Sequence, residues 1–167
     1  MASIKIAGTV NDSIVDGEGY RFTIFTQGCP HHCEGCHNPQ THDFTSGKPA
    51  DTEELLTRIL DNPLLSGVTF SGGEPFCQPE PLVELAEKLH DHGLDIWAYT
   101  GYTLEELSHM DNPAIAELLQ NIDVLVDGKF DLEQRDLTLA FRGSRNQRVI
   151  DMEKTREAGC IVKKKLD

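Results

Sequence analysis

Apolar runs typical of strands alternate along this chain with apolar residues at helical spacing. The strand-like runs are four to six residues long where they are clearest, and two weaker ones lie near the end of the chain. The predicted strands are 21–26, 67–70, 95–99, 123–127, 148–150 and 161–162.

Helical patterns occupy most of the stretches between these runs. Asp51 is expected to cap the first helix, with Glu54 three residues later as in a capping box. A second helix has apolar residues at i, i+3, i+4 and i+7 from Leu82 to Leu89, and Gly93 ends it. Further helix boundaries are expected at Thr103 with Glu106, at Pro113 and at Gly159.

Strands separated by helices indicate parallel βαβ units with right-handed crossovers. Five or six such units are too few for a closed eightfold barrel, which takes about 250 residues. The expected fold class is therefore α/β, an open partial (β/α) barrel with mainly parallel strands. A chain of 167 residues, 38% of them hydrophobic, is long enough for one buried core, so residues 1–167 are expected to form a single domain.

Residues suited to chemistry follow each of the first four predicted strands. A cysteine-rich loop comes after 21–26, and Ser71–Pro75 comes after 67–70. Thr100–Tyr102 and Asp127–Lys129 follow the next two strands. Because parallel strands end at one edge of a sheet, these four segments are expected to meet there, at the edge where α/β folds bind ligands.

The cysteine loop contains Cys29, Cys33 and Cys36 with the spacing Cys-x3-Cys-x2-Cys. A cubane iron–sulfur cluster is usually held by four thiolates, so three would leave one iron open, as catalytic metal sites require. The alternative is a structural zinc site completed by His37 or His42. With five cysteines in all, an odd number, metal ligation is a better explanation than a disulfide framework.

Charge is distributed unevenly along the chain. Residues 1–130 hold 21 acidic and 6 basic residues, whereas residues 131–167 hold 7 and 9, and the net charge is −13. An acidic body argues against nucleic acid as a partner, because phosphate contacts need positive charge. No apolar run is long enough to span a membrane and the first residues show no secretory pattern, so the expected location is the cytoplasm.

Cys-x3-Cys-x2-Cys after the first predicted strand, with Gly72-Gly73-Glu74-Pro75 after the second, resembles the radical S-adenosylmethionine superfamily. The match narrows to the family of activating proteins of anaerobic (class III) ribonucleoside-triphosphate reductases. The segments that carry this closer resemblance are Gln27–Pro39, Tyr99–Thr103, Val124–Phe130 and Phe141–Arg148.

The resemblance implies an enzyme with a partial barrel of the radical S-adenosylmethionine type, a [4Fe–4S] cluster and S-adenosylmethionine as cofactors. Its product would be a 5′-deoxyadenosyl radical that takes hydrogen from a glycine of the reductase, with reduced flavodoxin or ferredoxin as electron donor. Two related alternatives are an activase of another glycyl-radical enzyme, such as pyruvate formate-lyase, and a radical enzyme that acts on a small heterocycle. A zinc-stabilised binding module without enzymatic activity is the alternative from another class.

The resemblance also implies roles for individual residues. The metal ligands would be Cys29, Cys33 and Cys36. The backbone of Gly35, Cys36 and His37 would lie close to the cluster's open iron, and Gly72, Gly73 and Glu74 would contact the methionine amino group. Thr100 and Gly101 would contact the ribose or adenine. Asp127 and Lys129 would contact the methionine carboxylate or a monovalent cation.

Some of these residues have simpler explanations. Glu74 is equally suited to fixing its turn, and Asp127 and Lys129 to an ordinary strand-end turn with solvated charges. The basic stretch from Arg142 to Arg148 is expected near the surface that docks the partner reductase, because it is the main positive segment beside the predicted site.

Overall fold

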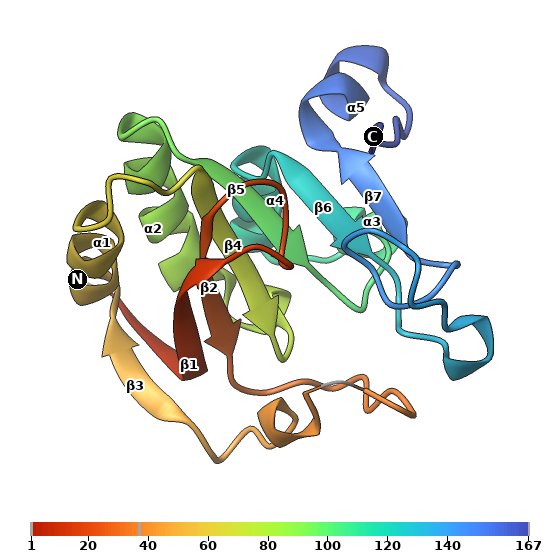
Figure 1. The fold of residues 1–167 in the computed structure, drawn as a ribbon, viewed down its shortest axis with the longest axis horizontal. Coiled ribbons are helices and arrows are strands. Elements are labelled where there is room, and N and C mark those ends of the chain that lie inside the picture. The colour runs from red at the N-terminus through yellow and green to blue at the C-terminus, as the bar shows by residue number, and fades with distance from the viewer. Residues whose placement is uncertain (1, 37, 167) are drawn as a thin grey trace.

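The computed structural model describes residues 2–36 and 38–166. Within them the chain forms one seven-stranded sheet in the order β3-β1-β2-β4-β5-β6-β7 (Figure 1). Because this order starts at β3 and ends at β7, the sheet is open over the described residues. The strands are β1 (Ser3–Ser13), β2 (Arg21–Thr26), β3 (Lys48–Asp51), β4 (Gly67–Gly72), β5 (Asp95–Tyr99), β6 (Val124–Asp127) and β7 (Arg148–Asp151).

The centre of the sheet is parallel and its two sides are antiparallel. β2 pairs in parallel with β4, β4 with β5, and β5 with β6. β1 runs antiparallel to both β2 and β3, and β7 runs antiparallel to β6. The expected open α/β sheet with mainly parallel strands is therefore confirmed, and the four strands that precede the chemical clusters are all parallel.

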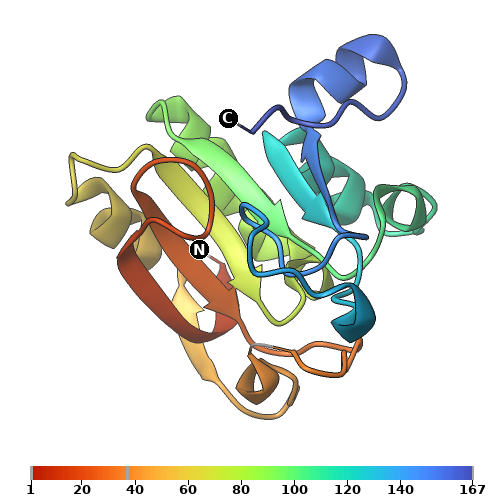
Figure 2. The same ribbon diagram turned by 45° about the vertical axis from the view of Figure 1, so that its right-hand side comes forward.

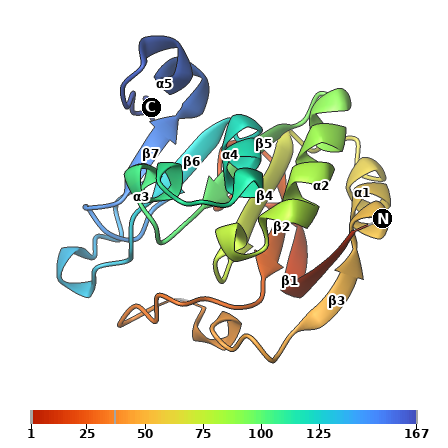
Figure 3. The same cartoon turned by 180° about the vertical axis from the view of Figure 1, so that it is seen from behind.

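Three helices cover one face of this sheet: α1 (Thr52–Leu60), α2 (Pro79–Asp91) and α4 (Pro113–Gln120), as Figure 3 shows. The main core lies between them and the sheet, where Leu82, Leu85 and Leu89 are fully buried. The remaining helical elements are α3 (Leu104–Ser108), α5 (Met152–Ala158), and the 3-10 turns η1 (Pro39–Thr41), η2 (Pro75–Cys77) and η3 (Leu132–Gln134).

The opposite face of the sheet carries a smaller cluster and the candidate site. Trp97 alternates with the core residues Ile96 and Ala98, so its side chain lies on this second face, where it packs edge-on against Phe141. Figure 2 shows the segment after β6 crossing this face close to the loop after β2. Arg21 is fully buried nearby, hydrogen-bonded to Thr69 Oγ1 at 2.7 Å.

Most local signals for helix ends are confirmed. Thr103 and Glu106 form a complete capping box at the start of α3, and Gly159 ends α5 in the left-handed conformation. At α1 the Asp51 side chain does cap the helix, although it accepts its bond from the Glu53 amide.

Three features of the sheet were predicted wrongly or missed. β7 is antiparallel to β6, so the last strand does not complete a further parallel βαβ unit. The predicted strand 161–162 is absent from the described residues, where the backbone makes only a bridge between Ile150 and Lys163. β1 and β3 were not predicted, because polar and glycine positions interrupt the alternation in β1 and β3 has only four residues. Direction and edge pairing are set by tertiary contacts, which the local pattern does not contain.

Candidate functional site

A cavity of about 550 Å³ lies on the second face, at the carboxyl ends of the parallel strands. It is lined by residues of all four predicted clusters, Cys29 after β2, Gly72 at the end of β4, Thr100 after β5 and Gly128 after β6. The sequence therefore predicted correctly which segments meet at this edge of the sheet.

The three clustered cysteines line the same cavity. Backbone bonds hold the loop in place: the Cys29 amide donates to the His42 carbonyl at 3.2 Å, and the Cys36 amide to the Cys33 carbonyl at 3.1 Å. Burial raises the pKa of the Cys29 and Cys33 thiols, so a bound metal would have to displace their protons. Among the described residues, no three His, Cys, Asp or Glu side chains converge on a single metal ion; in a cubane, each thiolate binds an iron of its own.

Gly72 and Gly73 allow the end of β4 to pack directly on the cysteine loop. Gly72 has a φ of 93°, and a Cβ there would overlap the Thr26 amide. A Cβ on Gly73 would overlap the Gly28 carbonyl, and the Gly73 amide donates to the Thr26 carbonyl at 2.8 Å. Both glycines line the cavity, so a larger residue would displace the backbone that forms its wall.

Glu74 lies behind this wall, with 0% of its side chain exposed. Its carboxylate accepts hydrogen bonds from the Phe76 amide at 3.0 Å, the Gly101 amide at 2.8 Å and the Thr100 hydroxyl at 2.8 Å. His31 Nε2 lies 2.7 Å from the same carboxylate. Of the two roles open at the sequence level, fixing the turn is the one for which the structure supplies contacts.

The other predicted cofactor residues lie in different surroundings. Thr100 and Gly101 line the cavity. Gly35 has a φ of 75° and packs against Leu132. Lys129 is close enough to Cys33 for its charge to lower the thiol pKa, although burial raises that pKa overall. His37 lies outside the described residues.

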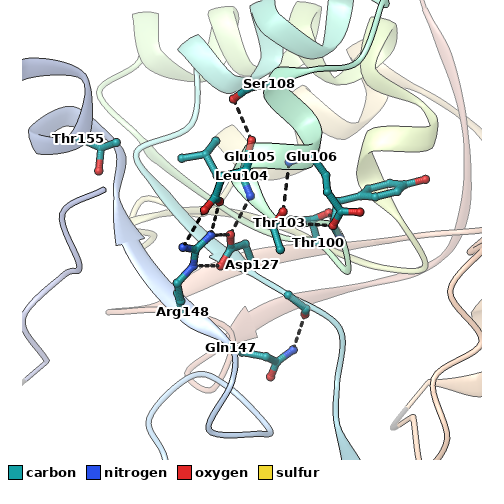
Figure 4. Close-up of polar contacts among 12 residues, drawn as sticks. Thr100, Thr103, Leu104, Glu105, Glu106, Ser108, Asp127, Gln147, Arg148 and Thr155 are labelled. Atoms are coloured by element: carbon teal, nitrogen blue, oxygen red, sulfur yellow. Dashed lines mark hydrogen bonds and ion pairs between the residues drawn. The ribbon is translucent and has the colours of Figure 1, made fainter. Parts of the chain in front are cut away.

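Asp127 is 1% exposed and binds residues of the chain itself (Figure 4). It accepts the Leu104 amide at 2.8 Å, at the start of α3, and forms two hydrogen bonds with Arg148. Arg148 also pairs with Glu105 at 2.6 Å. These two ion pairs balance the positive charge of Arg148 within the fold, and the hydrogen bonds to Asp127 and Glu105 raise its pKa.

Two residues to which the sequence gave other roles, His42 as a possible zinc ligand and Arg142 in the basic stretch, carry buried polar atoms without a partner. Among the described residues, His42 Nε2 and Arg142 Nε are the buried side-chain nitrogens or oxygens that make no hydrogen bond. Both side chains line the cavity. Because an unsatisfied buried polar group costs about 1–3 kcal/mol, such atoms mark a place where a ligand supplies the hydrogen-bond partner.

The residues present fit an iron–sulfur cluster and an adjoining cofactor. Three thiols supply the ligand set, the cavity of about 550 Å³ adjoins them, and the unpaired Arg142 Nε–H can donate a hydrogen bond to sulfur or to a carboxylate. A family model described as a 4Fe-4S single cluster domain matches residues 15–150. Fold and site thus define an iron–sulfur enzyme of the radical S-adenosylmethionine class.

Curated relatives narrow this class further. The chain is 39% identical over 142 residues to the anaerobic ribonucleoside-triphosphate reductase-activating protein of Salmonella typhi, covering 80% of this chain and 90% of that protein. The protein of that name from Escherichia coli (strain K12) has the same identity and coverage, and the one from Enterobacteria phage T4 is 33% identical over 142 residues, with 81% and 86% covered. The chain belongs to the family of anaerobic ribonucleoside-triphosphate reductase-activating proteins.

The predicted family, enzyme class and cofactors are therefore confirmed.

Among solved structures, QueE from Escherichia coli is similar with a TM-score of 0.48 at 22% identity, covering 60% of this chain and 54% of that one. Among the described residues, no helix combines the length and apolar character needed to cross a membrane.

Proposed function

We propose that this chain activates an anaerobic ribonucleoside-triphosphate reductase by removing a hydrogen atom from a glycine of that enzyme. The observation that carries the proposal is that Cys29, Cys33, Cys36 and the Gly72–Gly73 strand end line one cavity. When bound, a [4Fe–4S] cluster supplies the electron that cleaves S-adenosylmethionine to methionine and a 5′-deoxyadenosyl radical.

The chain's own residues would bind and orient these groups. The three cysteines would each hold an iron, and the backbone at Gly72, Gly73, Thr100 and Gly101 would form the wall beside the cofactor. Arg142 and Lys129 would provide positive charge for the methionine carboxylate. The orphaned Nε of Arg142 supports this role, as does the effect of Lys129 on the Cys33 pKa.

Apolar side chains would shield the radical from water. Phe130, Leu139 and Phe141 belong to the segment after β6 and line the cavity. A dry wall of this kind limits side reactions of a reactive intermediate. The electron donor would be a reduced flavodoxin or ferredoxin, and the location the cytoplasm, where thiols remain reduced.

The basic stretch from Arg142 to Arg148 would dock the reductase, and its three arginines lie in different surroundings. Arg148 is neutralised by Asp127 and Glu105, and Arg142 lines the cavity. Arg145 is the exposed one of the three. Charge reversal at Arg145 is therefore the change that addresses docking without altering the cavity wall.

The proposal is tested by anaerobic reconstitution with iron and sulfide, followed by co-incubation with a class III reductase and S-adenosylmethionine. The expected result is about four irons per chain in the cluster, release of 5′-deoxyadenosine, and a glycyl radical on the reductase seen by paramagnetic resonance. Cys33→Ala should abolish all three, whereas Cys160→Ala, an exposed cysteine outside the motif, should change none.

Two results would contradict this function. A protein that takes up zinc and stays colourless would be the binding module without enzymatic activity. A protein that cleaves S-adenosylmethionine but puts a radical on a pyruvate formate-lyase, and not on the reductase, would be an activase of the other kind.

A further inference from the structure

His31 lines the cavity and connects the cysteine loop to the strand ends that form the cavity wall. It lies between Cys29 and Cys33, yet its Nε2 reaches the Glu74 carboxylate at 2.7 Å. Its side chain is 5% exposed and that of Glu74 is 0% exposed. Because a carboxylate only accepts hydrogen bonds, Nε2 is the donor, and the bond is made away from water.

Glu74 in turn joins three segments. It caps η2 through the Phe76 amide, and it accepts from Thr100 and Gly101 just after β5. With His31 as the fourth donor, one carboxylate holds together the cysteine loop, the end of β4 and the start of the loop after β5. Its oxygens are occupied by these internal donors, which leaves little capacity for a contact with a bound cofactor.

The surroundings of the His31 ring fix it further. A Cβ on Gly101 would overlap the ring, and the Tyr102 ring packs edge-on against it with centroids 4.5 Å apart. The ring therefore fits a slot that requires glycine at position 101 and is closed by Tyr102. A side chain held on several sides defines its hydrogen-bond geometry closely.

We propose that His31 is a positioning residue of the cofactor site. Its bond to Glu74 sets the distance between the loop that carries the three cysteines and the strand ends that face S-adenosylmethionine. Glu74 acts through this bond and its backbone partners rather than by touching the cofactor. This inference rests on the proposed function, since it takes S-adenosylmethionine as the ligand of the cavity.

The test compares four variants of the reconstituted protein: His31→Gln, His31→Asn, Glu74→Gln and the control His32→Asn. Gln places an amide nitrogen near the position of Nε2, whereas Asn is too short to reach Glu74. His32 lies in the same loop with a φ of 48°, which asparagine tolerates, and its ring faces His42 instead. The readouts are iron content, the paramagnetic resonance spectrum of the reduced cluster with and without S-adenosylmethionine, and the dissociation constant of S-adenosylmethionine.

All four variants should retain the iron content of the unmodified protein, because the cysteines are unchanged. His31→Asn and Glu74→Gln should bind S-adenosylmethionine about 10-fold more weakly and show an altered cofactor-dependent spectrum. His31→Gln and His32→Asn should match the unmodified protein in both. The double variant His31→Asn/Glu74→Gln should lose no more affinity than Glu74→Gln alone, because the bond that His31→Asn removes is one of the bonds that Glu74→Gln also disturbs.

Three results would overturn the inference: normal affinity in His31→Asn, additive losses in the double variant, or loss of iron from His31→Asn alone. None of these measurements uses the reductase. A protein that binds S-adenosylmethionine as expected but leaves the reductase inactive would therefore contradict the proposed function and leave the role of His31 standing.

Discussion

Glu74 and Asp127 are two buried carboxylates in comparable positions that hold different parts of the molecule together. Each lies at or just after the carboxyl end of a parallel strand, each accepts an amide from the first turn of a helical element, and each faces a basic side chain. The basic partner of Glu74 is His31 of the cysteine loop, whereas that of Asp127 is Arg148 of β7. The carboxylate at β4 therefore shapes the candidate site, and the one at β6 fastens the antiparallel edge strand and α3 to the sheet.

The comparison predicts that Asp127→Asn will mainly reduce stability. The change leaves the partly buried Arg148 with only the exposed Glu105 as its acidic partner, and breaking a buried pair costs about 3–5 kcal/mol. The free energy of unfolding, measured with denaturant, should fall by this amount. Asp111→Asn, at an exposed carboxylate, is the matched control and should change it by less than about 0.5 kcal/mol.

The dissociation constant of S-adenosylmethionine decides which role Asp127 has. If Asp127 only fastens the sheet edge, the folded variant binds the cofactor normally. If Asp127→Asn instead binds S-adenosylmethionine clearly more weakly with unchanged stability, the cofactor contact predicted from the sequence would be supported. Asp127 and Glu74 would then no longer differ in which part of the molecule they hold.

Gly101→Ala tests the bond between His31 and Glu74 without altering any polar side chain. The added methyl group would overlap the His31 ring, so it should displace His31 from Glu74. Overpacking of this kind costs about 1–3 kcal/mol of stability. Affinity for S-adenosylmethionine should fall as in His31→Asn, whereas Gly8→Ala, where a Cβ meets no atom within 4 Å, should leave it unchanged. Normal affinity in Gly101→Ala would show that the position of His31 does not matter to the cofactor.

Much of the site could be predicted from the sequence because its residues lie at strand ends. Strand periodicity placed the cysteine loop, Gly72 and Thr100 at one edge of the sheet, and the structure has them lining one cavity. Spacing along the chain determines this much, since parallel strands all end on the same side.

The links between those strand ends could not be predicted in the same way. His31 and Glu74 are 43 positions apart, and Arg148 and Asp127 are 21 apart. Nothing in the local pattern distinguishes a carboxylate that faces a ligand from one that faces its own chain. The partnerless nitrogens of His42 and Arg142 likewise became visible only once burial and hydrogen bonding were known.

The smallest expected effect belongs to Glu105, the second carboxylate beside Arg148. Its side chain is 61% exposed, so Glu105→Gln should cost less than about 1 kcal/mol at pH 7, far less than Asp127→Asn. The hydrogen bond from Arg148 lowers the pKa of Glu105 below its ordinary value of 4.5. Its contribution is therefore fully present above about pH 4.5 and is lost as the pH falls through the lowered pKa. Denaturant unfolding of the unmodified protein and of Glu105→Gln at pH 7 and at pH 3.5 should show that their difference in free energy of unfolding is smaller at the lower pH. A difference that grows on acidification, or that equals the effect of Asp127→Asn, would mean that exposure does not determine how much each carboxylate beside Arg148 contributes.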